Sequence, residues 1–119
     1  MTLKLPKVYS DAYQLTLDVF ERTKSFPKQM RPNLGRRLEE ACLDLTSTTR
    51  KMLLCSKKEQ GLKKRYMRTA TEALDDLKFL IQLSSDLAIL TASGYGVLSE
   101  RLEEIGAQIG GLARHSKGY

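Results

Sequence analysis

Apolar residues recur at helical spacing through almost the whole chain, and this periodicity constrains the fold more than any other feature. Residues three and four positions apart share one face of an α-helix, whereas a half-buried strand requires strict alternation. Four segments show the helical pattern, and none alternates convincingly. The four apolar stripes are Val8, Ala12, Leu15 and Val19; Leu34, Leu38, Ala41, Leu45, Thr48 and Met52; Leu62, Tyr66, Ala70, Ala73, Leu77, Leu80, Ser84 and Leu87; and Tyr95, Leu98, Leu102, Ile105, Ile109 and Leu112. The sequence therefore predicts an all-α protein.

Local signals predict where these helices begin and end. The first helix, over about 8–23, should stop before Phe26-Pro27, because a residue that precedes proline is pushed out of the helical region. Pro32 suits the first turn of the second helix, which should end near residue 55. Ser56 and Glu59 form a capping-box pattern before a third helix of nearly 35 residues, and Thr91 fits the cap of the fourth.

Four amphipathic helices joined by short connections predict an up-and-down antiparallel four-helix bundle. The 119 residues suit a single domain, 1–119, with tails expected at 1–6 and 114–119. The first and third helices carry more apolar surface than one core requires, at Tyr9, Tyr13, Leu17, Phe20, Leu74, Phe79, Ile81 and Leu83. This surplus indicates either contacts between subunits or core positions outside the predicted stripes.

Three glycines fall close together in the fourth helix, at Gly106, Gly110 and Gly111. Glycine in a helix interior costs about 1 kcal/mol relative to alanine, so each position needs a structural reason. We expect close packing at Gly106 and the end of the helix at Gly111.

The cysteines and the lack of long apolar runs predict the cellular setting. Cys42 and Cys55 lie in one predicted helix, about 20 Å apart along its axis, which is too far for a disulfide. Both are expected to be buried free thiols in a reducing compartment. No apolar run approaches the roughly 18 residues of a membrane span, and Met1 to Lys7 lacks the apolar stretch of a secretory signal. We expect a cytoplasmic protein with no membrane role.

Basic residues concentrate between Arg50 and Arg68. This segment carries eight basic residues against one acid, Glu59, so it contributes +7 to a chain that nets +6 and the remainder nets −1. Such a concentration favours an extended polyanion such as RNA or DNA as partner, the alternative being a solvated helix face and turn. Tyr66, within the segment, is open to two interpretations, stacking on a base or packing in the core. The eight basic residues are Arg50, Lys51, Lys57, Lys58, Lys63, Lys64, Arg65 and Arg68.

Residues suited to catalysis are sparse. The single histidine, His115, falls in the predicted tail, which leaves the body without a histidine metal site or a histidine-supported nucleophile. Gly94-Tyr95-Gly96 lacks the third glycine and the strand of a phosphate cradle. Adjacent carboxylates at Glu39-Glu40, Asp75-Asp76 and Glu103-Glu104 diverge by about 100° on a helix. We therefore expect a protein that is not an enzyme and that requires no metal or cofactor.

Several short blocks, in order along the chain, resemble a known family. They are Phe26-Pro27, Arg31, Leu34-Gly35-Arg36-Arg37-Leu38-Glu39, Leu102-Glu103-Glu104-Ile105-Gly106 and Gly110-Gly111. With the basic turn before the third helix, they resemble the accessory variability determinant (Avd) proteins of diversity-generating retroelements. The wider group is similar to four-helix-bundle proteins encoded in intervening sequences of bacterial large-subunit rRNA genes. The likeness covers roughly residues 6–112, and residues 43–49 lack the Pro-x-Asn-x-Ala-Glu-Gly stretch typical of the intervening-sequence proteins, which favours the retroelement branch.

The resemblance implies a pentameric ring or barrel of four-helix bundles with a basic surface. It also implies binding of RNA, and possibly DNA, and association with the reverse transcriptase of the same locus during cDNA synthesis. Carried onto this chain, it adds Arg36 and Arg37 as candidate contacts with the polymerase or RNA. The alternative function is a helical module that joins proteins and has no nucleic-acid role.

Overall fold

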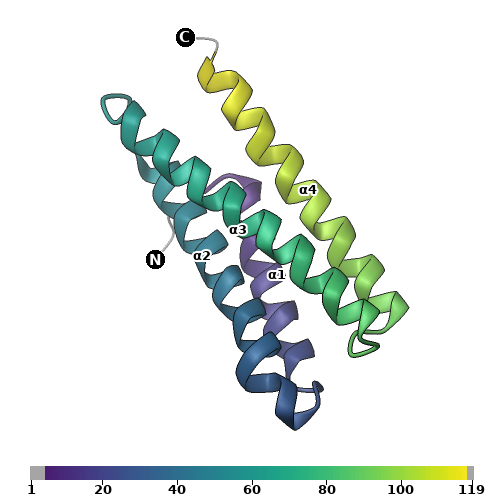
Figure 1. Ribbon diagram of the computed structural model, residues 1–119. Helices are drawn as coiled ribbons and strands as arrows, with labels where there is room; N and C mark the ends of the chain where they lie inside the picture. The colour runs from purple at the N-terminus through teal and green to yellow at the C-terminus, as the bar shows by residue number, and fades with distance from the viewer. Residues whose placement is uncertain (1–4, 118–119) are drawn as a thin grey trace.

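The predicted helical architecture is present in the computed structural model, which describes residues 5–117, with side chains placed through residue 114. Four α-helices follow one another: α1 (Lys7–Thr23), α2 (Arg36–Leu54), α3 (Gln60–Asp86) and α4 (Ala92–Lys117). A 3₁₀ turn, Lys28–Met30, and a π-helical turn, Arg31–Gly35, connect α1 to α2. No strand occurs over the described range. The chain is thus a four-helix bundle in this range (Figure 1).

Each helix packs against its neighbours in the chain, and α1 also packs against α4. The molecule is elongated, 47 × 29 × 21 Å. The α2–α3 turn lies at one end of the bundle, and the α1–α2 and α3–α4 connections lie at the other (Figure 1). The two ends of α2 are therefore far apart, which matters for the charged residues that they carry.

Hydroxyl and carboxylate groups fix the position of α1 against its neighbours. Thr16 Oγ1 lies 2.8 Å from Thr46 Oγ1 of α2, and the Thr23 hydroxyl donates to Glu39 at 2.6 Å. On the α4 side, the Gln108 amide donates to Asp11 at 2.8 Å. These polar contacts flank the apolar core and specify the register of α1.

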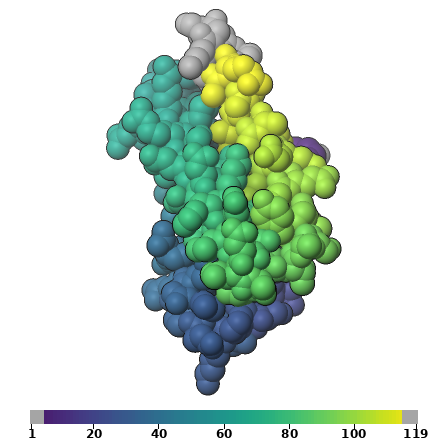
Figure 2. All heavy atoms as spheres, turned by 45° about the vertical axis from the view of Figure 1, so that its right-hand side comes forward, coloured from purple at the N-terminus to yellow at the C-terminus, as the bar shows by residue number. Residues whose placement is uncertain are grey.

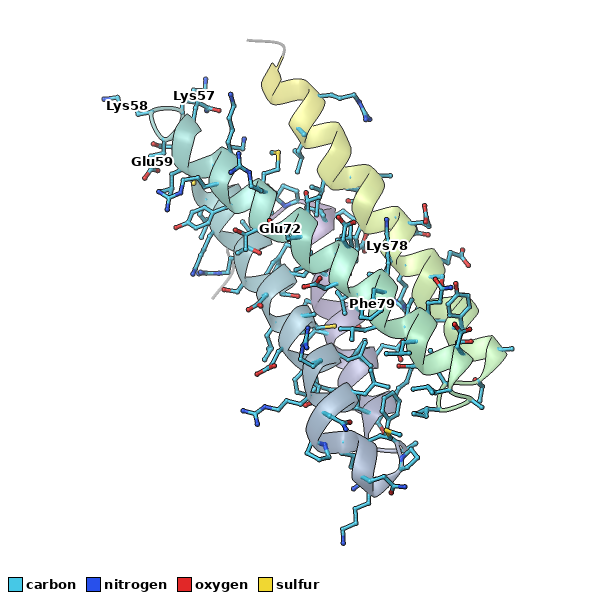
Figure 3. All side chains as sticks on the ribbon, in the orientation of Figure 1. Lys57, Lys58, Glu59, Glu72, Lys78 and Phe79 are labelled. Atoms are coloured by element: carbon cyan, nitrogen blue, oxygen red, sulfur yellow. The ribbon has the colours of Figure 1, made fainter. Side chains whose placement is uncertain are left out.

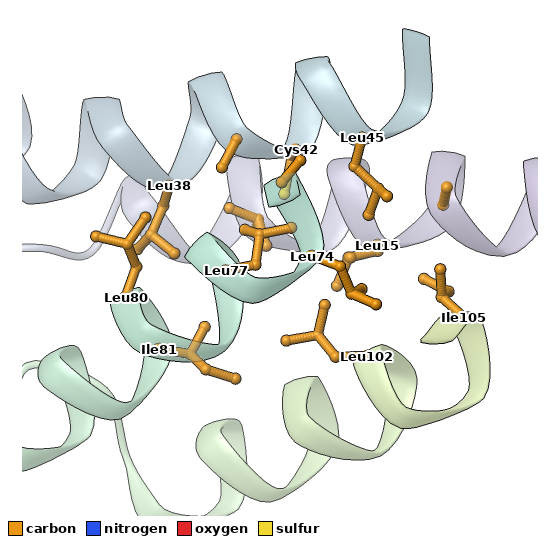
Figure 4. Close-up of a cluster of buried hydrophobic side chains, with 14 of the residues drawn as sticks. Leu15, Leu38, Cys42, Leu45, Leu74, Leu77, Leu80, Ile81, Leu102 and Ile105 are labelled. Carbon is orange, nitrogen blue, oxygen red and sulfur yellow. The ribbon is translucent and has the colours of Figure 1, made fainter. Parts of the chain in front are cut away.

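The core predicted for the first and fourth helices is confirmed. In α4, Leu98, Leu102, Ile105 and Ile109 are buried, and Tyr95 and Leu112 pack half-buried against the core. In Figure 4, side chains from all four helices meet in one cluster. The stripe of α1 is fully buried, at Val8, Ala12, Leu15 and Val19.

The predicted stripe of α2 is wrong at one position. Thr49 is fully buried, whereas the predicted Thr48 is only half-buried and its hydroxyl bonds to the Asp44 carbonyl within the helix. Leu45, Thr49 and Met52 are spaced by four and three residues, so they also share one face of the helix. Near the end of α2 the buried face therefore contains Thr49 in place of the predicted Thr48.

The predicted stripe of α3 is only part of its buried surface. Met67, Leu74 and Ile81 are buried, whereas Leu62 and Tyr66 are half-buried and Leu87 is 50% exposed. α3 therefore turns a wider apolar face toward α2 and α4 than the predicted stripe supplies. The buried residues are Met67, Ala70, Ala73, Leu74, Leu77, Leu80, Ile81 and Ser84.

Burial in α3 divides the surplus apolar residues into two groups. Leu74 and Ile81 belong to the core of this chain, so the second of the two interpretations is correct for them. Phe79 on α3 and Tyr13 and Leu17 on α1 stay exposed, at 61%, 47% and 51%. Together with Phe20 of α1, which is 36% exposed, this second group is available for contacts with other molecules.

Of the two predictions for the glycines of α4, the one for Gly106 is confirmed and the one for Gly111 is wrong. A Cβ at Gly106 would lie 3.1 Å from Leu74 Cδ2, so this glycine allows close packing of α4 on α3. Gly111 does not end the helix, because α4 continues to Lys117 through residues that were expected to form a tail. Residues 1–4 and 118–119 of the predicted tails lie outside the described residues.

The two cysteines occupy different environments. Cys42 is fully buried, and burial raises the pKa of its thiol to about 12, so it stays protonated at neutral pH. Cys55, just after α2, is half-buried. The expectation of two free thiols agrees with the structure, but only Cys42 is fully buried.

Ala88 ends α3 in a conformation that favours glycine. Its φ is 59°, in the left-handed region, and the Ile89 N–H donates to the Ser84 carbonyl at 2.9 Å while the Ala88 N–H donates to Ser85 at 2.9 Å. This is a Schellman arrangement, in which the left-handed position is usually glycine because a Cβ is strained there.

Ala88→Gly is therefore expected to raise the free energy of unfolding by about 0.5–1 kcal/mol, because it relieves the left-handed strain. The matched control is Ala107→Gly, on the exposed face of α4, which should lower it by about 0.5–1 kcal/mol. Urea unfolding of both variants measures the difference. Equal losses in the two variants would contradict this account of the α3 end.

Candidate nucleic-acid interface

The end of α2, the following turn and the start of α3 gather the eight basic residues of the Arg50–Arg68 segment at one end of the molecule. We call this group the basic tip; it comprises Arg50, Lys51, Lys57, Lys58, Lys63, Lys64, Arg65 and Arg68. Lys57 and Lys58 lie at the turn itself, at the end of the α2–α3 hairpin (Figure 3).

Seven of the eight side chains of the basic tip are exposed. Lys63 is half-buried, whereas its neighbours Lys64 and Arg65 face solvent. Lys64, Arg65 and Arg68 lie within little more than one turn of α3 and are all exposed. These three residues are the best placed to contact a ligand together.

Carboxylates do not neutralise the basic tip. Elsewhere in the bundle, five side-chain ion pairs form, at N–O distances of 2.7–3.5 Å. Among the side chains that the structure places, none of the eight tip cations lies within 4.0 Å of a carboxylate oxygen. The five pairs are Lys7–Asp11, Arg22–Asp18, Lys24–Glu21, Arg36–Glu40 and Arg101–Asp18. The tip thus presents like charges at close spacing without local compensation, an arrangement that attracts polyanions.

Glu59, the one acid in the segment, has a structural role in the turn. Its Oε1 accepts a hydrogen bond from the Ser56 backbone N–H at 2.8 Å, and this bond lowers the pKa of the carboxyl. The prediction that Ser56 caps the third helix is wrong, because α3 begins at Gln60 with Glu59 at its N-cap, so the bond from Ser56 closes the turn that precedes the helix. Because the folded pKa is depressed, this contribution is present above the unfolded pKa and is lost as pH falls through the folded value.

Tyr66 is half-buried and packs against the core rather than standing free as a stacking surface. The Lys51 ammonium lies 5.9 Å from the centre of its ring, within range of a cation–π contact. The exposed aromatic residues Tyr13, Phe20 and Phe79 belong to α1 and to the far part of α3. The tip therefore suits contacts with phosphates better than stacking on bases.

Arg36 and Arg37 do not belong to the basic tip. They open α2, whereas Arg50 and Lys51 lie in its last turns, so about 20 Å of helix separates the two groups. Arg36 lies 3.5 Å from Glu40, and Arg37 forms no ion pair among the placed side chains. The candidate site residues thus fall into two separate groups.

A second basic cluster, which the sequence analysis missed, surrounds Arg36 and Arg37. Residues 22–37 contain six basic residues and no acid. The net charge of −1 outside the Arg50–Arg68 segment concealed this stretch, and a count in short windows would have found it. The second basic cluster comprises Arg22, Lys24, Lys28, Arg31, Arg36 and Arg37, at the α1–α2 connection.

Part of the second cluster is used within the fold. Arg31 donates to the Phe26 carbonyl at 3.0 Å and to the Lys24 carbonyl at 2.8 Å, which holds the connection in place. Phe26 is buried below Gly35, consistent with α1 ending ahead of Phe26-Pro27. Lys28 is exposed and, like Arg37, has no ion pair in the part of the chain with placed side chains.

An open apolar groove of about 320 Å³ lies between the start of α2 and the end of α3. Phe79 borders it and is 61% exposed, in the lower half of α3 in Figure 3. The groove is lined by Met30, Asn33, Leu34, Arg37, Phe79, Leu80, Leu83 and Leu87. A separate apolar stripe of Tyr13, Leu17 and Phe20 runs along α1.

No protein-family model matches this chain, and no curated protein matches it. None of the helices in the described range has the length and apolar composition needed to cross a membrane. Over the same residues, no three histidine, cysteine or acidic side chains are grouped so that they could hold a metal ion. His115 lies outside the placed side chains.

Glu59→Gln should raise affinity for RNA by about 1.5- to 5-fold, the range of one exposed charge interaction. Glutamine keeps an oxygen that can accept from the Ser56 N–H, so the turn should persist while one negative charge leaves the tip. Fluorescence anisotropy measures the affinity. Glu103→Gln, an exposed acid on α4, is the control, and an equal gain there would show only an effect of net charge.

Proposed function

We propose that this protein is a non-catalytic accessory protein that binds nucleic acid and holds template RNA beside a reverse transcriptase in a diversity-generating retroelement. The observation that carries the nucleic-acid role is the basic tip, whose eight cations have no carboxylate within 4.0 Å among the placed side chains. The retroelement role rests on the resemblance of the sequence blocks to Avd proteins. The setting proposed is the cytoplasm.

Binding would work through phosphates. Each lysine or arginine that neutralises a phosphate releases a condensed counterion, so affinity is strong at low salt and carries little base specificity. Arginine grips a phosphate through two parallel hydrogen bonds, which makes Arg65, Arg68 and Arg50 the residues most suited to defined contacts. The lysines add charge with less fixed geometry.

We also propose that the chain assembles into a closed ring, of five subunits if the resemblance holds. Two different apolar surfaces support this: the α1 stripe of Tyr13, Leu17 and Phe20, and the groove beside Phe79. When one surface of a subunit binds a different surface of the next, the contacts can close into a ring. A ring would present several basic tips to one RNA, and their weak contacts would add through high effective concentration.

The second candidate function is a helical module that joins proteins and binds no nucleic acid. The apolar groove favours it, because a large exposed aromatic residue beside an open cavity is typical of protein contacts. Salt separates the two candidates, since phosphate binding weakens with salt whereas apolar contacts hold or tighten.

The nucleic-acid proposal predicts a steep salt dependence. If a subunit neutralises about 5 phosphates, log affinity should fall against log salt with a slope of roughly −4 to −5. Changing Lys64, Arg65 and Arg68 to Gln should flatten the slope by about 2 to 3, since each contact contributes about 0.9. Fluorescence anisotropy over a salt series measures it.

The control for this series is Lys78→Glu combined with Arg101→Gln, which removes the same three units of charge from the body of the bundle. Both residues are exposed and lie outside the basic tip. A salt slope near zero for the unaltered protein would contradict the nucleic-acid role and favour the protein-joining module.

The assembly proposal predicts a mass well above the 13.5 kDa chain in light scattering at micromolar concentration. Phe79→Glu should lower the mass toward that of one chain, because it places a charge in the apolar contact. Gln82→Glu, an exposed position on the same helix, should leave the mass unchanged. A mass of 13.5 kDa for the unaltered protein at every concentration would exclude the ring.

The partner proposal predicts co-purification with the reverse transcriptase of the same locus and a change in template-dependent cDNA synthesis when the protein is present. Arg36→Glu with Arg37→Glu should weaken the complex with polymerase or RNA through like-charge repulsion and lost pairs. Lys78→Glu with Arg101→Glu carries the same change of charge and serves as control. A polymerase that neither binds the protein nor changes its product would contradict the retroelement role.

A further inference from the structure

The two basic regions lie at opposite ends of the molecule. The basic tip surrounds the α2–α3 turn, and the second basic cluster surrounds the α1–α2 connection. In Figure 2 the turn, in teal, and the connection, in blue, lie at opposite ends of the space-filling surface. The molecule is 47 Å long, and α2 alone separates Arg37 from Arg50 by about 20 Å.

An acidic belt separates the two basic regions. We give this name to Asp44 of α2 and Glu72, Asp75 and Asp76 of α3, which are exposed and form no ion pair among the placed side chains. Residues 38–49 and 69–77 contain no lysine or arginine. Glu72 lies between the turn and Phe79 along α3 in Figure 3. A phosphate chain that followed α2 or α3 from one basic region to the other would pass these carboxylates.

Screening makes the two ends electrically independent. At physiological salt the Debye length is about 8 Å, so a separation of about 20 Å exceeds it more than twofold. A phosphate bound at the tip therefore does not neutralise the cations of the second cluster, and it hardly repels a phosphate that binds there. Each end retains its own attraction for a polyanion while the other is occupied.

We propose that one subunit binds two separate nucleic-acid segments at once, one at each basic end, and so bridges them. This inference rests on the proposed nucleic-acid role and adds to it a second activity, the joining of two helical segments of RNA. The contacts are to phosphates, because no exposed aromatic side chain accompanies the basic tip among the placed residues. At the second cluster, Arg31 is held by backbone carbonyls, and Lys28 and Arg37 are the cations left with neither a carboxylate nor a carbonyl partner among the placed side chains.

A two-colour capture experiment tests the bridge. One short RNA duplex carries biotin and is held on beads, a second duplex carries a fluorophore, and the full-length protein is added. The readout is fluorescent duplex captured per protein retained on the beads. The unaltered protein should capture the second duplex, and Lys28→Gln with Arg37→Gln should lose most of that capture per retained protein. Lys78→Glu, which changes the charge by the same two units, should keep it.

Each other outcome has a distinct meaning. Protein retained on the beads without capture of the second duplex overturns the bridge and leaves the nucleic-acid role standing. Undiminished capture by the Lys28→Gln and Arg37→Gln variant also overturns it, because bridging would then come from the tips of different subunits. Protein that is not retained at all defeats both proposals, and circular dichroism of each variant confirms that the helices are intact.

Discussion

Packing between α2 and α3 is the constraint on which the rest of this structure depends. Leu45 and Leu77 are fully buried, and both belong to the cluster where the helices meet (Figure 4). Fully burying a leucine side chain is worth about 1.5–3 kcal/mol, more than an exposed ion pair contributes, so apolar burial decides how the helices rotate about their axes. Once that rotation is set, the charged residues must occupy the outer faces and the ends.

The basic tip follows from this arrangement. Elsewhere in the bundle, acids such as Asp11 and Glu40 pair with nearby bases and others form the acidic belt, whereas the turn between α2 and α3 holds one acid, which already accepts from Ser56. Repulsion between the like charges of the tip lowers the stability of the fold, and apolar burial between α2 and α3 offsets this loss. The same burial keeps the second basic cluster at the far end of α2. Positive charge therefore lies at the two ends of the long axis, and the acidic belt lies between them.

Sequence periodicity predicted the four helices well because each buries one strong apolar stripe, as Val8, Ala12, Leu15 and Val19 do on α1. It failed on α3, where Leu74 and Ile81 fall outside the predicted stripe and are buried nonetheless. It also failed at Gly111, since local propensity is weaker than the helical context around it.

The candidate site was predicted in part. The concentration of charge between Arg50 and Arg68 is a local property, so it could be found from the sequence alone. That Arg36 and Arg37 lie about 20 Å from Arg50 already follows from the rise of the predicted second helix, whereas the groove that Arg37 lines with Phe79 depends on how α2 packs on α3 and needed the structure. The half-burial of Lys63 depends on the rotation of α3 and could not be inferred from composition.

Lysine footprinting by amine acetylation and mass spectrometry, with and without a short RNA duplex, tests the central claim most directly. Lysines occur at both ends and between them, so the acetylation of each lysine reports whether RNA covers its region. The account predicts protection of Lys57, Lys58 and Lys64 at the tip, with Lys78 of α3 reacting equally in both samples. Equal reactivity of the tip lysines with and without RNA, or protection confined to Lys78, would contradict it.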